Sequence, residues 1–339
     1  MTALDQYKEG VYPIKNIGVI MFGLLGDVLL RTPVLNALKI LHPDAKITVI
    51  VDPIGVAIFK DNPHVDNIIK IDRSKKSKYR YYMDKVIGIK KIRSKKFDLF
   101  IDLYNNSSSK VLIKSSGAKF KVGFLSEKGK YAYNIMSDAD QIKHNNNSLS
   151  IHHLKILYPL KNTLDYSIQE TLVVKKSTLN YLDDYIKEFN FDSKHLYTLN
   201  LGSRANDKIL SNTDYLTVVK YLYEKYSYIP AILCNPGQEY LQESFITDCL
   251  DKNSLPYIKL KGLQIEEVGA VMKLTKFTVT PDTGPLHIAA SAKAPILGLF
   301  IWTPSDEVTP EGSIFMSLNQ DLLKGKEFQE IIDSFVMAI

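Results

Sequence analysis

The hydrophobic residues of this chain fall into short runs, and stretches with helical periodicity follow most of them. A short apolar run bounded by turn residues is typical of a buried strand, and apolar positions three and four residues apart are typical of a helix. The predicted strands are 17–22, 47–51, 67–71 and 98–103, then 197–202, 229–234, 257–261, 277–280 and 295–300. Strands that alternate with helices form parallel sheets, so the expected fold class is α/β.

The alternation is interrupted between residues 144 and 171, where the chain is rich in His, Asn and Ser and holds one predicted helix, 149–158. A chain of 339 residues is longer than one average domain. We therefore predict two doubly wound domains, residues 1–170 and 171–339, that face one another across a cleft. The last helix is a candidate to pack back on the first domain.

Charge is distributed unevenly along the chain. There are 43 Lys and Arg against 37 Asp and Glu, a net charge of +6. Residues 1–160 hold 26 cations and 14 anions, and the remainder holds 17 and 23, so the two parts carry +12 and −6. Much of the excess lies in the basic stretch 70–96. Such a region indicates a polyanionic partner, such as a phosphorylated saccharide, a nucleic acid or an anionic membrane surface.

The composition favours a cytoplasmic protein. The two cysteines, Cys234 and Cys249, lack the spacing of a metal site or a disulfide framework, which fits reduced thiols. Residues 1–13 include Asp5 and Glu9 and lack the apolar core of a signal peptide. Because Asp27 interrupts the best candidate for a membrane span, we expect none.

The strongest local signal is the segment 281–290, Pro-Asp-Thr-Gly-Pro-Leu-His-Ile-Ala-Ala, directly after the predicted strand 277–280. We predict a tight turn at the carboxyl end of that strand and a helix that begins near Gly284. The first N–H groups of a helix lack partners within it, and the helix dipole adds positive charge there. The turn therefore suits a phosphate and predicts a nucleotide site around Thr283 and Gly284.

A second turn follows the first predicted strand, at Gly23-Leu24-Leu25-Gly26-Asp27. The G-x-G-x-x-G spacing of a dinucleotide-binding turn is absent, although Asp52 ends the next strand where a ribose-binding carboxylate would stand. The carboxylate of Asp27 would repel a pyrophosphate, but it could accept a proton from a neutral hydroxyl. It could equally cap the helix that begins there. The residues alone leave both roles of Asp27 open.

These two segments resemble the heptosyltransferase family, glycosyltransferase family 9, whose bacterial members have the GT-B fold and build the inner core of lipopolysaccharide. The family opens with a strand, a Gly-Asp turn followed by Leu, and a later Pro, which Gly26-Asp27-Val28-Leu29 and Pro33 match. It also carries Asp-[Ser/Thr]-Gly-x-x-His before a helix of small residues, matched by Asp282-Thr283-Gly284-Pro285-Leu286-His287. The resemblance spans most of the chain and implies a GT-B fold, with two Rossmann-like domains.

The resemblance also implies a reaction. It implies an inverting, metal-independent transfer of a heptose from ADP-heptose to a lipopolysaccharide-core or related saccharide, with no cofactor besides the nucleotide sugar. The carboxyl domain would hold the donor, and the amino domain would receive an anionic lipid-linked acceptor, with no nucleic acid as partner. The basic stretch would then contact the acceptor or the cytoplasmic face of the inner membrane, as a peripheral protein does. Its other interpretation is a solvated helix and loop.

By the same resemblance, Asp27 is the base for the acceptor hydroxyl, and Lys208 neutralises the departing diphosphate, a task that Arg204 could share or take. Glu239 would bind ribose hydroxyls, or be a first-turn Glu that the helix dipole favours. Asp282 would cap the helix or accept a sugar hydroxyl, since a carboxylate facing a phosphate repels it. The residues expected to bind the donor are Gly26, Ser203, Arg204, Glu239, Leu263, Asp282, Thr283, Gly284 and His287. Leu263 would form an apolar wall for the base, and His287 would bind phosphate or sugar or be structural.

The chain departs from the family after the predicted strand 295–300, where Ile301-Trp302-Thr303-Pro304-Ser305 replaces Gly-Pro-Thr-Asp-Pro. Trp302 either stacks on a sugar or base or packs against the core. A changed loop could mean a changed sugar, so a glycosyltransferase that uses another nucleotide sugar stays open. A sugar-nucleotide epimerase or hydrolase of the same architecture would not need the basic first half, and a noncatalytic binding protein would not need Asp27.

Overall fold

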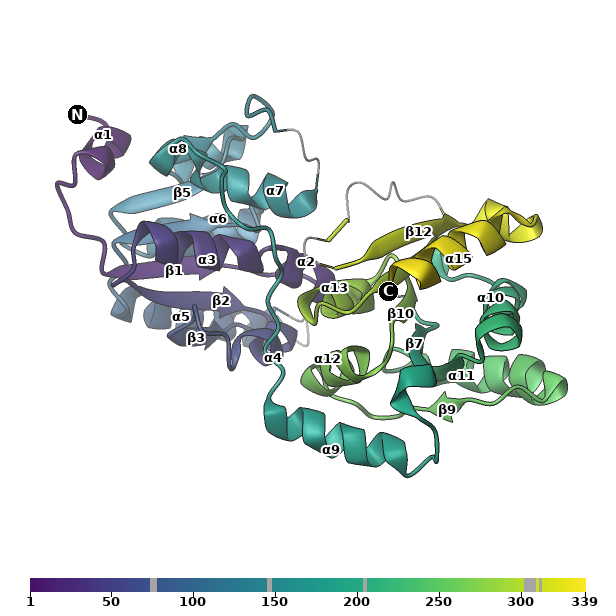
Figure 1. Cartoon of the computed structure of the whole chain (residues 1–339). Helices are drawn as coiled ribbons and strands as arrows, with labels where there is room; N and C mark the ends of the chain where they lie inside the picture. Colours follow the sequence, from purple (N-terminus) through teal and green to yellow (C-terminus); the bar gives the residue numbers. More distant parts are fainter. Residues whose placement is uncertain (74–77, 145–147, 204–205, 302–308, 311–312) are drawn as a thin grey trace. The chain divides into compact units, whose positions relative to one another are not determined.

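The computed structural model describes residues 1–73, 78–144, 148–203, 206–301, 309–310 and 313–339. The chain divides into two compact units, Met1–Thr171 and Leu172–Ile339. Each unit contains a parallel sheet of six strands with helices on its two faces (Figure 1). The expected α/β fold class, with two Rossmann-like domains, is confirmed.

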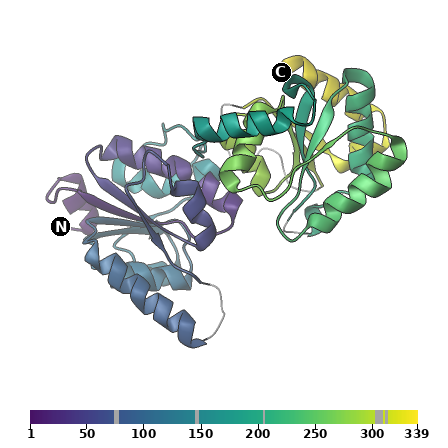
Figure 2. The same ribbon diagram turned by 90° about the horizontal axis from the view of Figure 1, so that it is seen from below.

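The sheet of the first unit has the strand order β3-β2-β1-β4-β5-β6. Its strands are β1 (Asn16–Ile20), β2 (Lys46–Val51), β3 (Asn67–Lys70), β4 (Leu99–Asp102), β5 (Phe120–Phe124) and β6 (Ile135–Ser137). Its helices are α1 (Ala3–Lys8), α2 (Leu25–Leu30), α3 (Thr32–Leu41), α4 (Val56–Phe59), α5 (Lys78–Ser94), α6 (Ser107–Ser115), α7 (Leu149–Leu154) and α8 (Tyr158–Lys161). Helix α5 lies on the opposite side of this sheet from α3 (Figure 2).

The sheet of the second unit has the order β12-β11-β10-β7-β8-β9. Its strands are β7 (Leu196–Asn200), β8 (Ile229–Leu233), β9 (Ile258–Lys259), β10 (Thr278–Pro281), β11 (Ile296–Phe300) and β12 (Phe315–Asn319). Its helices are α9 (Lys176–Lys187), α10 (Asn212–Tyr226), α11 (Glu239–Phe245), α12 (Ile265–Leu274), α13 (Gly284–Ser291) and α15 (Glu327–Ala338). A short 3-10 turn, η5 (Asn206–Lys208), follows β7.

Both sheets reverse their strand order once. The reversal lies between β1 and β4 in the first unit and between β7 and β10 in the second. At such a topological switch point the connections after two neighbouring strands leave toward opposite faces, which opens a crevice at the carboxyl ends of the strands. The turn at Gly23 follows β1 and the turn at Thr283 follows β10, so each predicted motif borders a switch point.

The first predicted helix is interrupted, and forms α2 and α3 with a break at Arg31. Pro33 has no N–H, so it cannot donate to the carbonyl of Leu29, four residues earlier. The hydroxyl of Thr32 donates to that carbonyl instead, at 2.7 Å. The break follows from the sequence, and it places Arg31 close to the turn after β1.

Three strands were not predicted: β5, β6 and β12. Two of them, β6 and β12, are edge strands. Strand β5 contains Gly123, where a Cβ would lie 2.3 Å from Cε2 of Tyr133, so the ring occupies the space of a side chain. Strand β6 has three residues, and four of the five residues of β12 are not buried. A short strand, an incompletely buried strand and a glycine within a strand all weaken the apolar run on which the prediction depends.

The last helix, α15, packs within the second unit. Helix α15 buries Phe328, Ile332 and Phe335 in the core of the second unit, and the ring of Phe335 packs edge-on against Phe277, 5.4 Å between centroids. Its apolar face is therefore used within its own unit. None of the described helices combines the length and the apolar character that a membrane-spanning helix needs.

A polar cluster also fastens α15 to α10. The carboxylate of Asp333 accepts hydrogen bonds from the hydroxyls of Tyr221 (2.7 Å) and Tyr226 (2.6 Å) and from Nζ of Lys225 (2.6 Å). Burial disfavours the charged form of Asp333, but the hydrogen bonds from Lys225, Tyr226 and Tyr221 outweigh it and lower the pKa of Asp333 from 3.8 to about 2.

We expect Asp333→Asn to lower the free energy of unfolding at pH 7, because the variant loses the charge that pairs with Lys225. The loss should be about 1 kcal/mol, since the ion pair is partly exposed. A pKa that is depressed in the folded state stabilises the protein above the unfolded value, and the stabilisation is lost as the pH falls toward 2. Urea unfolding at pH 7 and pH 3 measures this difference, with Asp321→Asn at an exposed position as control. An equal loss at both pH values would contradict the assignment.

Candidate active site

The segment 281–290 forms the turn and helix that the sequence predicts. Strand β10 ends at Pro281, Thr283 is the N-cap of α13, and Gly284 is its first residue. The Thr283 side chain makes no capping hydrogen bond within the described chain, and its hydroxyl donates to the carbonyl of Pro281 at 3.3 Å. The N–H groups at the start of α13 are thus not capped by this hydroxyl, and they can bind an anion.

Asn200, at the end of β7, connects the two sides of the second switch point. Its side chain is 1% exposed, and Nδ2 lies within hydrogen-bond distance of the Gly202 carbonyl (3.0 Å) and the hydroxyls of Thr280 (3.2 Å) and Thr283 (3.3 Å). Its Oδ1 has no partner among the described residues. An asparagine after an apolar run matches no sequence motif, so only the strand order points to Asn200.

Lys208 and Asp282 form an ion pair at the same edge of the sheet. Their side chains are 24% and 12% exposed, and they come from η5 and from the turn after β10. The negative charge of Asp282 is therefore balanced by Lys208, which removes the repulsion that a carboxylate would exert on a nearby phosphate. Thr283, and not Asp282, holds the N-cap position of α13.

The loops after β7 and β8 are fixed to each other. The carbonyl of Ser203, a residue only 2% exposed, accepts a hydrogen bond from Nε2 of Gln238 at 2.7 Å. Oε1 of Gln238 in turn accepts one from Nδ2 of Asn235 at 3.0 Å. A Cβ on Gly202 would lie 2.7 Å from Gln238 Oε1 and 3.0 Å from the backbone nitrogen of Asn235, so only glycine fits there without a shift.

The remaining predicted donor residues lie around this edge. Glu239 is exposed at the start of α11, and its Oε1 accepts the Gly237 N–H at 3.0 Å. Hydrogen bonds from its own backbone N–H and from that of Gly237 lower the pKa of Glu239, so it is charged at neutral pH. Leu263 is half-buried in the loop after β9, and His287 is 4% exposed within α13. The first-turn role of Glu239 is observed, and ribose binding stays a prediction.

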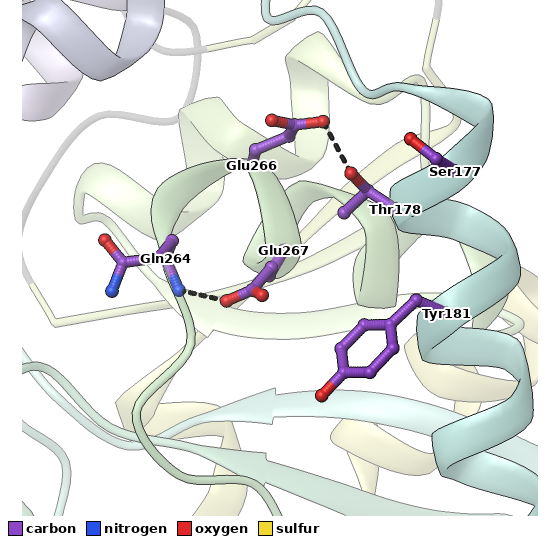
Figure 3. A pocket seen from close by; sticks show the side chains of 6 residues that line it. All are labelled: Ser177, Thr178, Tyr181, Gln264, Glu266 and Glu267. Atoms are coloured by element: carbon purple, nitrogen blue, oxygen red, sulfur yellow. Dashed lines mark hydrogen bonds between the residues drawn. The ribbon is translucent and has the colours of Figure 1, made fainter.

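A shallow hollow between α9 and α12 contains none of the predicted residues (Figure 3). Oε1 of Glu266 accepts hydrogen bonds from the hydroxyl of Thr178 (2.8 Å) and the N–H of Lys175 (3.0 Å), and so joins the two helices. Oε2 of Glu267 accepts the N–H of Gln264 at 2.6 Å and caps α12. The carboxylates of the hollow therefore have structural roles.

Asp27 is the third residue of α2 and is exposed. Its Oδ2 accepts the N–H of Leu24 at 3.1 Å, so the capping interpretation is observed. No hydrogen bond to Oδ1 is found in the described chain, and that oxygen can accept a proton from a ligand. Gly26 is half-buried next to it. The two roles that the sequence left open for Asp27 are compatible, because each needs a different oxygen.

Asp52 is engaged by protein groups and leaves no open ribose site. It accepts the N–H of Gly23 at 3.0 Å, and both its oxygens accept hydrogen bonds from Arg73, each at 2.7 Å. The guanidinium of Arg73 lies 4.2 Å from the ring centroid of Phe22 and 4.5 Å from that of Tyr104. Asp52 thus holds the turn after β1 and anchors the beginning of the basic stretch.

Three features raised by the sequence cannot be placed. Arg204, Trp302 and residues 74–77 of the basic stretch lie outside the described residues. In the part of the chain that is described, no group of three or more His, Cys, Asp or Glu side chains could hold a metal ion.

Comparisons with known proteins give a consistent result. The sequence profile of glycosyltransferase family 9 (heptosyltransferase) matches residues 88–331, a range that begins after Asp27. The chain is 24% identical over 300 residues to lipopolysaccharide heptosyltransferase 3 of Escherichia coli K12, with 83% of each chain covered.

Solved structures support the fold. The chain is similar to the glycosyl transferase family 9 protein of Veillonella parvula, with a TM-score of 0.80 and 20% identity over 93% of this chain and 89% of that one. It is also similar to E. coli ADP-heptose lps heptosyltransferase II, with a TM-score of 0.76 and 16% identity over 95% and 99%.

We expect Asn200→Leu to lower the free energy of unfolding by about 1–3 kcal/mol, since the Gly202 carbonyl and the buried Thr280 hydroxyl lose their hydrogen bonds from Nδ2. Urea unfolding followed by circular dichroism measures the loss. The control is Asn253→Leu, an exposed asparagine with one hydrogen bond, to the Cys249 carbonyl. An effect of Asn200→Leu no larger than that of the control would show that the amide does not hold the switch point.

Proposed function

We propose that this chain, which belongs to glycosyltransferase family 9 (heptosyltransferase), transfers a heptose from ADP-heptose to a lipopolysaccharide-core or related saccharide acceptor. The family match over 88–331 carries the reaction class, a glycosyltransferase. The choice of ADP-heptose and of the acceptor draws on the names of similar proteins, lipopolysaccharide heptosyltransferase 3 and ADP-heptose lps heptosyltransferase II. The anion-binding turn at the start of α13 supports a donor with a diphosphate.

In this proposal the donor diphosphate lies at the start of α13, against the N–H groups around Gly284 and beside the ammonium of Lys208. Asp282 holds Lys208 at this edge, so the cation is in place before the donor binds. Charge on the diphosphate grows as the sugar leaves, and donors fixed in advance stabilise that charge without reorganising. Losing one such donor costs roughly 3 kcal/mol, which is about a hundredfold in turnover.

The chemical step needs a base for the acceptor and a stabilised leaving group. The acceptor hydroxyl oxygen attacks the anomeric carbon on the face opposite the diphosphate, and its proton passes to Asp27 as the new bond forms. The bond from the anomeric carbon to the diphosphate oxygen breaks with its electron pair, so the configuration inverts. The Leu24 N–H fixes one oxygen of Asp27 and so orients the carboxylate. The proposal calls for no metal or further cofactor, because Lys208 and α13 supply the positive charge.

We expect the wild-type protein to transfer heptose from ADP-heptose in the presence of acceptor, and to do so equally well with a chelator. Asp27→Asn should bind the donor with the same affinity and lose most of its turnover, by about 100-fold or more, because it lacks a base. The measurements are donor affinity by calorimetry and transfer by product analysis.

Each outcome separates two explanations. Turnover without an acceptor would indicate an epimerase or hydrolase, and preference for a UDP- or GDP-sugar would correct the donor. Loss of activity with the chelator would contradict the metal-free step. Near-normal turnover of Asp27→Asn would contradict the role of Asp27.

We also propose that α5 contacts an anionic membrane surface, at the cytoplasmic face where a lipid-linked acceptor would be reached. Met83, Val86 and Ile87 lie three and four residues apart on α5 and are 43–49% exposed. Lys90 and Lys91, in the following turn, are exposed as well. An exposed apolar stripe next to cations is typical of a helix that lies in a membrane interface.

Gly88 and Ile92, which lie on the other side of α5 from this stripe, are buried, so the stripe faces away from the core. Ile92 is fully buried, and a Cβ on Gly88 would lie 2.8 Å from Cδ1 of Ile71, which shows how closely that face packs. The charge of the basic stretch is complementary to anionic lipid headgroups.

We expect the double variant Val86→Ser/Ile87→Ser to bind vesicles that contain anionic lipid about tenfold more weakly than wild type, since it removes apolar area from the interface. Co-sedimentation with vesicles of phosphatidylcholine and phosphatidylglycerol measures the partition. Ile40→Ser, at a 59% exposed position on α3, is the control. Equal binding of all three proteins, or equal binding to neutral vesicles, would contradict the proposal.

A further inference from the structure

Arg31 is a buried cation beside the predicted base. Its side chain is 8% exposed, and its Nη1 donates to the carbonyl of Phe22. A Cβ built on Gly23, whose φ is +143°, would lie 3.0 Å from Oδ2 of Asp27 and 3.2 Å from Nη1 of Arg31. Both side chains therefore border the same glycine. Arg31 holds the carbonyl before it, and Asp27 holds the N–H of Leu24 after it.

The charge of Arg31 is offset mainly by carboxylates. Burial lowers the pKa of Arg31, and the charges of Asp27, Asp102 and Tyr104, in that order, act against this. The Nε of Arg31 has no hydrogen-bond partner among the described residues. Among the groups that favour the charged form of Arg31, Asp27 has the largest effect.

Asp102, the second carboxylate near Arg31, is held by hydrogen bonds from other groups. It is fully buried at the end of β4, and its oxygens accept hydrogen bonds from the N–H groups of Tyr104 and Asn105 and from the hydroxyl of Tyr133. Burial raises the pKa of Asp102 in spite of these bonds. Its orientation is set by β4 and the turn after it, whereas the exposed Asp27 side chain has one hydrogen bond, from Leu24, and the charge of Arg31.

The helix packed against α2 and α3, α7, adds no positive charge at this point. Burial lowers the pKa of His153 well below its ordinary value, and the charges of Arg31 and His152 add to this. Burial also lowers the pKa of His152, and Lys155 lowers it further against the opposing effect of Asp140. Positive charge on either imidazole is therefore disfavoured, and in the described part of the chain Arg31 is the cation that borders Gly23 together with Asp27.

We propose that Arg31 is a positioning residue that holds the Asp27 carboxylate by its charge and fixes the backbone turn on which Asp27 depends, leaving Oδ1 for the acceptor hydroxyl. The inference rests on the proposed function, in which Asp27 is the base. Arg31 acts through Asp27 and through the Phe22 carbonyl. The family motif quoted above requires Gly26, Asp27, Leu29 and Pro33, and assigns nothing to the residue at 31.

The test compares Arg31→Met, which removes the charge and keeps an extended side chain, with Arg31→Lys, which keeps the charge. The first readout is the NMR chemical shift of the Asp27 carboxyl carbon at pH 7, assigned with Asp27→Asn, and it needs no substrate. We expect this resonance to move in Arg31→Met and to stay near its wild-type position in Arg31→Lys, since only Arg31→Met removes the cation that borders the carboxylate. Lys46→Met, at an exposed residue that begins β2, is the control with the same loss of charge.

The second readout is transfer. We expect Arg31→Met to lower kcat about 30-fold with donor KM changed less than threefold, and Arg31→Lys to keep most of the wild-type turnover. In an Asp27→Asn background, Arg31→Met should have no further effect on turnover, because its effect passes through Asp27.

An unchanged Asp27 resonance in a folded Arg31→Met would overturn the proposal, as would equal effects of Arg31→Met on turnover in both backgrounds. If Arg31→Met does not fold, Arg31→Gln allows the same measurements without the charge. Failure of wild type to use ADP-heptose would contradict the proposed function and leave the NMR measurement as the test of Arg31. An active wild type with unaffected Arg31 variants would contradict only this inference.

Discussion

In a parallel sheet, every strand delivers its following loop to the same edge, and those loops separate from one another only where the strand order reverses. This constraint applies once in each unit, between β1 and β4 and between β7 and β10. Asp27 lies in the helix after β1, Asn200 is the last residue of β7, and Asp282 and Thr283 follow β10. The candidate site residues gather at these two places because backbone N–H groups and short polar side chains there are not used in hydrogen bonds between strands.

Charge at both switch points is arranged before any ligand arrives. Lys208 is paired with Asp282 beside the start of α13, and Arg31 stands beside Asp27 after β1. A phosphate that binds at the start of α13 meets Lys208 already in position and Asp282 already neutralised by it. Preorganisation of this kind reduces the rearrangement that binding and reaction would otherwise require.

The sequence predicted what local patterns determine. Buried strands such as β1, β2 and β10 are continuous apolar runs, and the turn at Thr283 follows from Gly and Pro at fixed positions, so these were found. Strands β6 and β12 lie at sheet edges; β6 has three residues, and one of the five residues of β12 is buried, so neither is a continuous apolar run. Contacts between distant positions could not be read in this way. The partner of Asp282 is 74 residues away, and the partner of Asp52 is 21 residues away in the basic stretch.

Arg73 shows that the cations of the basic stretch do not all have the same role. Its guanidinium lies against the rings of Phe22 and Tyr104 and donates to both oxygens of Asp52. A planar guanidinium can make this pair of hydrogen bonds, and the ammonium of a lysine could not. One positive residue of the stretch thus belongs to the architecture of the first strand turn. A variant that neutralises every cation of this stretch would break the Arg73–Asp52 ion pair as well as remove the positive charge. A variant that keeps Arg73 would separate the two effects.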